Sequence, residues 1–258
     1  MMITAHGIME KLSTPMKVLI YDELTSTNNT AKELGRSGVG EDLIVIARRQ
    51  SGGRGRLGRS FFSPEGGLYM SLLIHPRILV SRSLNITTAA AVAVCRAIES
   101  MTDKKCSVKW VNDIYINGRK VCGILTESAV NNEGELEFAV LGIGVNLTPP
   151  KNGFPEELKS RAGAVFNDIS ECEADQIAAA IVNEFMRLYS TGLNSHEFIE
   201  EYRERSFLIG REINVMHIHD GDSCKATAVG IDGDFGLEVR YPDGTASVLT
   251  SGDVSVRE

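Results

Sequence analysis

The chain has 258 residues, 43% of them hydrophobic and 24% charged, which is typical of a globular protein with room for a large domain and a small one. A formal net charge of −7 disfavours non-specific binding of nucleic acid by the molecule as a whole. The longest uncharged stretch in a helix-like region, Leu84–Cys95, is much shorter than the roughly 20 residues of a transmembrane helix, and the N-terminus lacks a secretory signal pattern, so we expect a cytoplasmic protein.

The five cysteines are odd in number and scattered, and no two of them form a Cys-x-x-Cys pair. This pattern disfavours both a disulfide framework and a zinc site, and it predicts reduced thiols that are mostly buried. The cysteines are Cys95, Cys106, Cys122, Cys172 and Cys224.

Residues 1–145 predict alternating strands and helices after an N-terminal tail. Residues 1–16 have mixed polarity and contain Pro15, so we expect a tail or linker there. Ser26 or Thr27 can cap a short helix that runs to Leu34 and stops at Gly35. The remaining predicted elements are strands at Val18–Leu24, Leu43–Ala47, Gly67–His75 and Leu136–Val145, a buried helix at Asn85–Met101, and a hairpin that turns at Asn117-Gly118 between Ile114–Ile116 and Val121–Thr126.

The second half of the chain predicts helices followed by short strands. Apolar residues at helical spacing predict helices at about Ala174–Tyr189 and His196–Arg205. After Phe207, short alternating segments separated by glycines predict a small antiparallel barrel of roughly 50 residues, so we place the boundaries at 1–16, 17–206 and 207–258. The predicted strands of the barrel are Ile213–Ile218, Lys225–Val229, Leu237–Tyr241, Ala246–Leu249 and Val254–Val256.

A loop rich in arginine and glycine, Gly52–Arg59, is the most distinctive segment. Glycines let backbone N–H groups approach a ligand closely, and arginines donate to phosphate or carboxylate groups. The residue order is neither that of a Walker loop nor that of a Rossmann fingerprint. We expect a small anionic ligand, with an exposed basic loop that binds RNA or nothing as the alternative. No acid occurs between Leu43 and Pro64, whereas five arginines do: Arg48, Arg49, Arg54, Arg56 and Arg59.

Lys120 and the residues before it form a second candidate group. Lys120 follows a tight turn and can be aimed at a phosphorus centre, or it is a solvated hairpin residue like Arg119. Asn112 and Asp113 are either turn residues or, in the case of Asp113, a metal ligand.

Two further groups of small polar residues lie at the ends of predicted strands. Ser26, Thr27 and Asn28 stand at a strand-to-helix junction, where they can bind a urea or carboxylate group or simply cap the helix. Gly142–Asn146 stands at the end of a predicted strand. Its glycines permit close approach of a ligand, and Asn146 offers a donor and an acceptor; the alternative is that the strand simply ends in a bend.

Together and in this order, these segments resemble the biotin–protein ligases, or biotin–[acetyl-CoA-carboxylase] ligases. The similarity covers residues 17–258 and rests on STN at 26–28, Gln50 before GRGRLGR at 53–59, KWVNDIYINGRKVCGIL at 109–125 and GIGVN at 142–146. It implies an α+β fold, in which a mixed β-sheet catalytic domain at 17–206, related to class II aminoacyl-tRNA synthetases, precedes a small SH3-like β-barrel domain at 207–258.

The resemblance also implies an activity. Biotin would be activated with ATP to biotinyl-5′-AMP and then transferred to a lysine of a biotin carboxyl carrier protein, such as that of acetyl-CoA carboxylase. Lys120 and Arg56 would be the catalytic residues, and Mg²⁺ would enter with ATP near Asp113. The residues implied for biotin are Ser26, Thr27, Asn28, Gln50, Arg54, Gly55, Arg56 and Lys120, and those for the nucleotide are Phe61, Asn112, Asp113, Gly123, Asn146 and Arg257.

This sequence departs from the family pattern at two motif positions. Val111 stands where the motif usually has proline, and Phe61 stands where a well-known member has a tryptophan near the adenine. No helix-turn-helix sequence precedes residue 17, although residues 3–12 resemble the linker that follows this domain in bifunctional members, so we expect a ligase that does not bind DNA. A homodimer is a possible assembly. The alternative functions are a lipoate–protein ligase of the same superfamily and an RNA-binding module.

Overall fold

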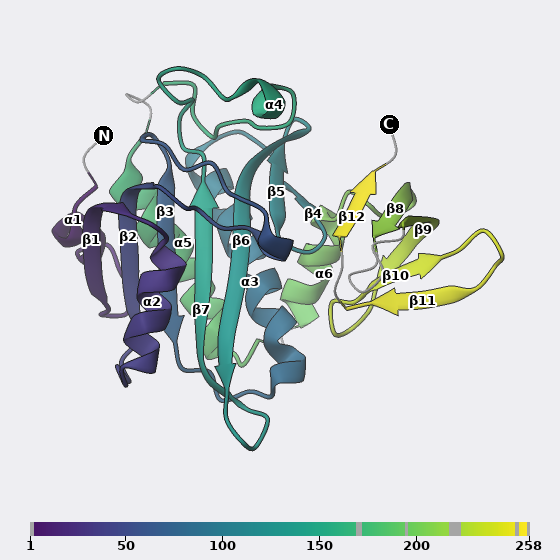
Figure 1. Cartoon of the computed structure of the whole chain (residues 1–258), viewed down its shortest axis with the longest axis horizontal. Helices are drawn as coiled ribbons and strands as arrows, with labels where there is room; N and C mark the ends of the chain where they lie inside the picture. Colours follow the sequence, from purple (N-terminus) through teal and green to yellow (C-terminus); the bar gives the residue numbers. More distant parts are fainter. Residues whose placement is uncertain (1–2, 169–171, 194–195, 217–222, 251–252, 257–258) are drawn as a thin grey trace.

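Two β-sheets organise the molecule in the computed structural model, which describes residues 3–168, 172–193, 196–216, 223–250 and 253–256 (Figure 1). The large sheet has seven strands in the order β1-β2-β3-β7-β6-β5-β4, and the small sheet has five in the order β11-β10-β9-β8-β12. This combination of sheets with helices confirms the predicted α+β class. Within the described ranges, no helix is both long and apolar enough to cross a membrane.

The large sheet is mixed, because β1 and β2 run parallel while its other neighbouring strands run antiparallel. β3 is an apolar run that is buried along its whole length, as expected for a strand covered on both faces. The strands are β1 (Lys17–Leu24), β2 (Leu43–Gln50), β3 (Leu68–Ile74), β4 (Ser107–Lys109), β5 (Asp113–Ile116), β6 (Arg119–Val130) and β7 (Leu136–Val145).

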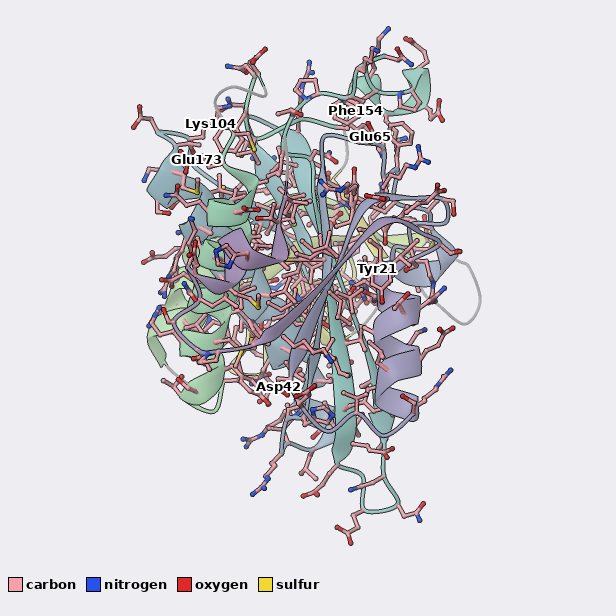
Figure 2. All side chains as sticks on the ribbon, turned by 90° about the vertical axis from the view of Figure 1, so that its left-hand side faces the viewer. Tyr21, Asp42, Glu65, Lys104, Phe154 and Glu173 are labelled. Carbon is pink, nitrogen blue, oxygen red and sulfur yellow. The ribbon has the colours of Figure 1, made fainter. Side chains whose placement is uncertain are left out.

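Helices cover both faces of the large sheet. On one face, α3 (Ser83–Met101) lies against β5 and β6, and it packs against α5 (Ala174–Ser190) and α6 (His196–Arg205). On the other face, α2 (Thr27–Arg36) contacts β2, β3 and β7. Figure 2, in which β1 and Tyr21 face the viewer, shows α2 and α5 on opposite sides of the sheet. The predicted buried helix at Asn85–Met101 is confirmed, because α3 is buried nearly all round.

The end of α2 differs from the prediction. The helix continues through Gly35 to Arg36, and the chain turns at Gly38, whose φ of 86° is in the left-handed region. Gly35 lets α2 pack closely against β7, since a Cβ there would lie 2.9 Å from the Phe138 ring on that strand. Ser26 occupies the N-cap position with extended backbone, but its side chain makes no capping hydrogen bond.

The N-terminal segment, expected to be a tail or linker, contains a short helix, α1 (Ala5–Met9), that packs against α5. Thr4 donates to the Asp175 carboxylate through its backbone N–H and its hydroxyl, both at 2.9 Å. Asn183, two turns further along α5, accepts from the Ser13 backbone at 2.8 Å. With Ile8 fully buried, the segment is an integral part of this face of the molecule.

The C-terminal strands form the small antiparallel sheet, beside α6 in Figure 1. Its strands are β8 (Glu212–Met216), β9 (Ser223–Ile231), β10 (Leu237–Arg240), β11 (Ala246–Leu249) and β12 (Asp253–Val256). All five predicted strands are therefore present, although the predicted end of the first one, at 217–218, lies outside the described residues. The short helix α4 (Glu156–Lys159) lies between β7 and α5 in the chain.

Phe235 joins the small sheet to α6 and to the segment before β5. Its fully buried ring packs against Phe198 and Tyr202 of α6, at centroid distances of 4.8 and 5.4 Å. Its carbonyl oxygen accepts from the Trp110 indole N–H at 2.8 Å, and Trp110 lies in the loop between β4 and β5. The small sheet therefore contacts the segment that precedes Asn112 and Asp113.

Candidate functional site

A small, partly open cavity lies where α2 begins, on the face of the large sheet that α2 covers, and its empty volume of about 310 Å³ includes open solvent at its mouth. The loop between β2 and β3 crosses in front of β7 and β6 in Figure 1 and contributes to the cavity wall. Seven of the predicted site residues line it, namely Ser26, Thr27, Asn28, Gln50, Arg54, Phe61 and Gly123. Its other lining residues are Tyr69, Met70, Leu125, Gly142, Ile143 and Gly144.

Glycines on β6 and β7 form a flat wall of this cavity. Gly123 and Gly144 are register partners, and a Cβ on either would lie 3.0 or 2.7 Å from the Phe61 ring. A Cβ on Gly142 would lie 2.0 Å from the Asn28 side-chain oxygen. These positions need glycine because aromatic and amide side chains lie directly on the backbone of the two strands.

The polar floor of the cavity is a chain of hydrogen bonds from α2 to β2 and β3. Gln50 Oε1 accepts from the Thr27 backbone N–H at 2.8 Å, and its amide nitrogen donates to Ser63 Oγ at 3.0 Å. Ser71 Oγ lies 2.7 Å from both Thr27 Oγ1 and Asn28 Oδ1. The Thr27 and Asn28 side chains are thus held in place before any ligand binds.

An acidic side chain, Glu127 on β6, connects this floor to the arginine loop. It accepts from Asn28 Nδ2 at 3.0 Å, from Lys32 Nζ at 2.7 Å and from Arg54 Nη1 at 3.1 Å. Burial by itself raises the pKa of Glu127, but the hydrogen bonds from Lys32 and Asn28 and the charges of Lys32 and Arg54 outweigh it and hold the pKa below its usual range.

Sequence reasoning did not select Ser71 or Glu127. Ser71 is the one polar residue in the buried run of β3, and this departure from an apolar pattern could have identified it. Glu127 follows the matched motif by two residues, and no local pattern distinguishes it from a solvated strand residue.

The arginine and glycine loop is folded back on itself. Gly55 N–H donates to the Arg59 carbonyl at 2.7 Å, and Phe61 N–H donates to the Gly53 carbonyl at 2.9 Å. Leu57 has a φ of 55°, an uncommon conformation for a residue with a side chain. Arg56 reaches across to Asn112 Oδ1 at 3.4 Å, so the tip of the loop contacts the segment before β5.

Lys120 is directed toward the same region. Its Nζ lies 2.6 Å from Asp113 Oδ1 and 5.9 Å from the centroid of Phe61, and its side chain is 32% exposed. A register shift between β5 and β6 pairs Lys120 with Tyr115, and bulges of this kind re-aim side chains near active sites. Its backbone N–H donates to the Arg161 carbonyl at 2.8 Å. These contacts differ from those of a freely solvated hairpin lysine.

The predicted residues therefore fall into two groups on either side of Phe61. The first is the polar cavity floor, and the second contains Arg56, Asn112, Asp113 and Lys120. Asn146 lies further away in the network, since its amide donates to the Gly163 carbonyl at 2.9 Å and supports the segment beside Lys120. Gly55 belongs to the loop without lining the cavity, and Arg257 lies outside the described residues.

Neither a metal cluster nor a reactive thiol is part of this arrangement. Among the residues that the structure describes, no group of three or more His, Cys, Asp or Glu side chains could hold a metal ion. All five cysteines are free, and three of them are buried. Burial raises the pKa of the Cys122 thiol well above its usual value, which favours the protonated form of this cysteine next to Gly123.

Comparison with known proteins connects this geometry to one family. The model of the biotin/lipoate A/B protein ligase family matches residues 21–146. The bifunctional ligase/repressor BirA of Bacillus subtilis is 41% identical over 146 residues, which cover 56% of this chain and 45% of that protein. The chain thus spans about half the length of this relative. The biotin–[acetyl-CoA-carboxylase] ligase of Mycobacterium tuberculosis is 28% identical over 245 residues, covering 90% of this chain and 87% of that protein.

Solved structures give the same result for the fold. The biotin protein ligase of Aquifex aeolicus in complex with biotin and ATP superimposes with a TM-score of 0.72 at 26% identity, over 93% of this chain and 98% of that chain. The biotin protein ligase of Leishmania major in complex with biotinyl-5-AMP superimposes with a TM-score of 0.63 at 25% identity. The superposition covers 92% of this chain and 100% of that chain. The fold is that of the biotin protein ligases, and residues 21–146 are similar to the biotin/lipoate A/B protein ligase family.

Proposed function

We propose that this protein is a biotin–protein ligase, which activates biotin with ATP and transfers it to a lysine of a biotin carboxyl carrier protein. The observation that carries the proposal is the arrangement of a polar cavity and a cationic group on either side of Phe61. The polar cavity suits a small ring with hydrogen-bonding groups, and the cationic group suits a carboxylate and a phosphate.

In this proposal, the ring of biotin occupies the cavity. Ser26, Thr27 and Asn28 from the start of α2, together with Gln50, contact its ureido group, while Arg54 lies at the rim. Phe61 and Met70 supply apolar surface for the remainder of the ring. The relative from Aquifex aeolicus, whose structure contains biotin and ATP, supports this placement through its shared fold.

The chemistry takes place beside Phe61. A carboxylate oxygen of biotin attacks the α-phosphorus of ATP, the bond to the bridging oxygen breaks, and pyrophosphate leaves. Lys120 stabilises the negative charge that builds up on the phosphoryl oxygens, and Gly55 and Arg56 cover the resulting mixed anhydride and exclude water. The amine of a carrier lysine then attacks the acyl carbon, and AMP leaves.

The nucleotide is proposed to contact Phe61, Asn112, Asp113 and Gly123, with Asn146 supporting the site from behind and Arg257 contributing from the C-terminal end. We propose that Mg²⁺ enters bound to the phosphates of ATP. A single carboxylate plus substrate phosphates is a common way to hold this ion, and Asp113 is the carboxylate next to Lys120. Replacing Asp113 with Asn should raise the Mg²⁺ concentration needed for half-maximal activity.

Exchange of labelled pyrophosphate into ATP tests the proposed function directly. We expect exchange that requires biotin and is not supported by lipoate, followed by biotinylation of an added carrier domain. Exchange with lipoate alone would identify a lipoate–protein ligase. Salt-sensitive RNA binding without any exchange would support the nucleic-acid module and contradict the proposal.

A further inference from the structure

Glu127 holds together three elements that surround the cavity. With Gly123 and Leu125, it lies on the cavity face of β6, since alternate residues of a strand point to the same side. Lys32 and Asn28 reach it from α2, and Arg54 reaches it from the loop at 3.1 and 3.2 Å to its two oxygens. A carboxylate that is only 20% exposed requires such partners.

The contact with Asn28 determines which way the Asn28 amide points. Its nitrogen donates one proton to the Leu125 carbonyl at 3.2 Å and the other to Glu127 Oε2 at 3.0 Å. An amide nitrogen has two protons, so both are used. The Asn28 oxygen therefore faces Ser71 and the cavity, where Gly142 leaves room for it.

Ser71 reinforces this orientation. Its hydroxyl is shared between Thr27 Oγ1 and the Asn28 oxygen, each at 2.7 Å, and it must be the donor in the bond to Asn28, because an amide oxygen cannot donate. This bond uses one of the two acceptor positions of the oxygen and leaves the other for a ligand N–H. Without an acceptor at residue 127, the Leu125 carbonyl at 3.2 Å would be left to oppose a turned-over amide. Ser71 can also accept, so the amide could then turn and present a donor to the cavity.

We propose that Glu127 is a positioning residue that fixes the Asn28 amide as a hydrogen-bond acceptor and thereby makes the cavity select rings that carry N–H donors. Lys32 and Arg54 hold the carboxylate in place for this task. The inference rests on the proposed function, because the cyclic urea of biotin is the ring with N–H donors that the cavity would receive.

Glu127→Gln in the full chain is the first test, with biotin affinity measured by calorimetry. Glutamine at position 127 keeps the shape of the side chain but has only one acceptor oxygen, for which the donors of Lys32, Arg54 and Asn28 then compete. One of these donors must also face the new amide nitrogen, which cannot accept. We expect biotin binding to weaken about 10- to 100-fold, the scale of a lost hydrogen bond to a charged group. Glu41→Gln makes the same change in an exposed pair with Lys17, and as the control it should change the affinity less than about threefold.

A double-mutant cycle shows whether the effect passes through Asn28. In an Asn28→Ala background, Glu127→Gln should cause little further loss of biotin affinity, because the residue that Glu127 orients is gone. NMR signals of the Asn28 side-chain amide, assigned by Asn28→Ala, should exchange with solvent faster in Glu127→Gln. A merely structural role would give additive losses and would leave these signals unchanged.

The outcomes separate the two proposals. If the wild-type protein binds no biotin, the proposed function fails. If it binds biotin and Glu127→Gln binds equally tightly, or if the losses are additive, the role of Glu127 is refuted while the proposed function stands. Should Glu127→Gln fail to fold, Lys32→Met combined with Glu127→Met replaces the ion pair by apolar side chains and carries the same expectation.

Discussion

At the scale of single residues, the site depends on where charge is placed. Lys120 is held by a strand on one side and by Asp113 at 2.6 Å on the other, so its ammonium group has a defined position. Arg56 stands on the loop instead, and it reaches Asn112 Oδ1 at 3.4 Å. A fixed cation suits stabilisation of a transition state, whereas a cation on a loop suits closure around an intermediate.

Lys120→Ala should therefore reduce biotin-dependent pyrophosphate exchange by orders of magnitude, equivalent to roughly 3–4 kcal/mol of transition-state stabilisation. Arg119→Ala is the matched control, since Arg119 is the exposed neighbour in the same hairpin and should leave the exchange rate unchanged. Equal rates for wild type and Lys120→Ala would mean that Lys120 has no part in the activation step.

Arg56→Ala should allow the activated intermediate to escape. We expect free adenylate to accumulate in solution and to biotinylate lysines of bystander proteins, which can be followed by blotting with labelled streptavidin. Arg77→Ala removes an exposed arginine elsewhere and controls for the change in net charge. Adenylate retained as well as in the wild type would contradict the role of the loop.

At the scale of elements, a cluster of ion pairs joins α3 to α6. Arg205 binds both oxygens of Glu99 at 2.9 and 3.0 Å, and Glu201 pairs with both Arg205 and Arg96. Burial raises the pKa values of Glu99 and Glu201, but hydrogen bonds from Arg205 and Arg96 outweigh it and lower both. Carboxyl groups with lowered pKa values stabilise the fold above their unfolded pKa, and this contribution disappears as the pH falls through the folded value.

Glu99→Gln should accordingly lower the free energy of unfolding at pH 7, and the difference from wild type should shrink as the pH falls below about 4, near the ordinary pKa of glutamate. Urea unfolding at several pH values measures this difference. Glu156→Gln, in an exposed pair with Lys159, is the control and should have little effect at any pH. A difference that stays constant down to pH 3 would show that the cluster does not stabilise the protein through its charge.

Elements with local signals were predictable, and contacts between distant segments were not. The limits of β7 and α6 follow from local apolar patterns, and the Asn117-Gly118 turn follows from the ability of both residues to adopt positive φ, observed at 50° and 74°. Helix α1 was missed because it is held by Asp175, far away in the chain. For the same reason, Glu127 could not be selected, since its partners come from α2 and the loop.

At the scale of the whole molecule, the small sheet contacts the segment before β5 at Phe235. Phe235 fills the space beside α6, and its carbonyl oxygen accepts from Trp110 two residues before Asn112. The turn that carries Phe235 is itself ordered, because the Asp232 carboxylate accepts from the backbone of Gly236 at 2.7 Å. A loss of packing here affects both parts of the molecule.

Phe235→Ala should lower the free energy of unfolding by about 3–5 kcal/mol, the usual result for a large buried aromatic ring. Trp110→Phe keeps most of the packing and removes the hydrogen bond to the Phe235 carbonyl. We therefore expect it to lower the free energy of unfolding by about 0.5–1.5 kcal/mol. Urea unfolding followed by circular dichroism measures both values, with Val229→Ala, at an exposed position, as control. Two separate transitions in the wild type would show that the parts unfold independently and would contradict this coupling.

The glycine wall formed by Gly123, Gly142 and Gly144 has a consequence for changes of specificity. At these three positions the cavity wall is backbone, so substitutions there collide with Phe61 or Asn28 and offer no route to a new ligand. Adaptation to an altered ligand, by natural drift or by directed selection, must therefore proceed through the opposite side, at the start of α2 and at Gln50 and Ser71. Libraries of variants with substitutions confined to that side would contain most of the changes that can alter ligand specificity, and they would leave the sheet intact.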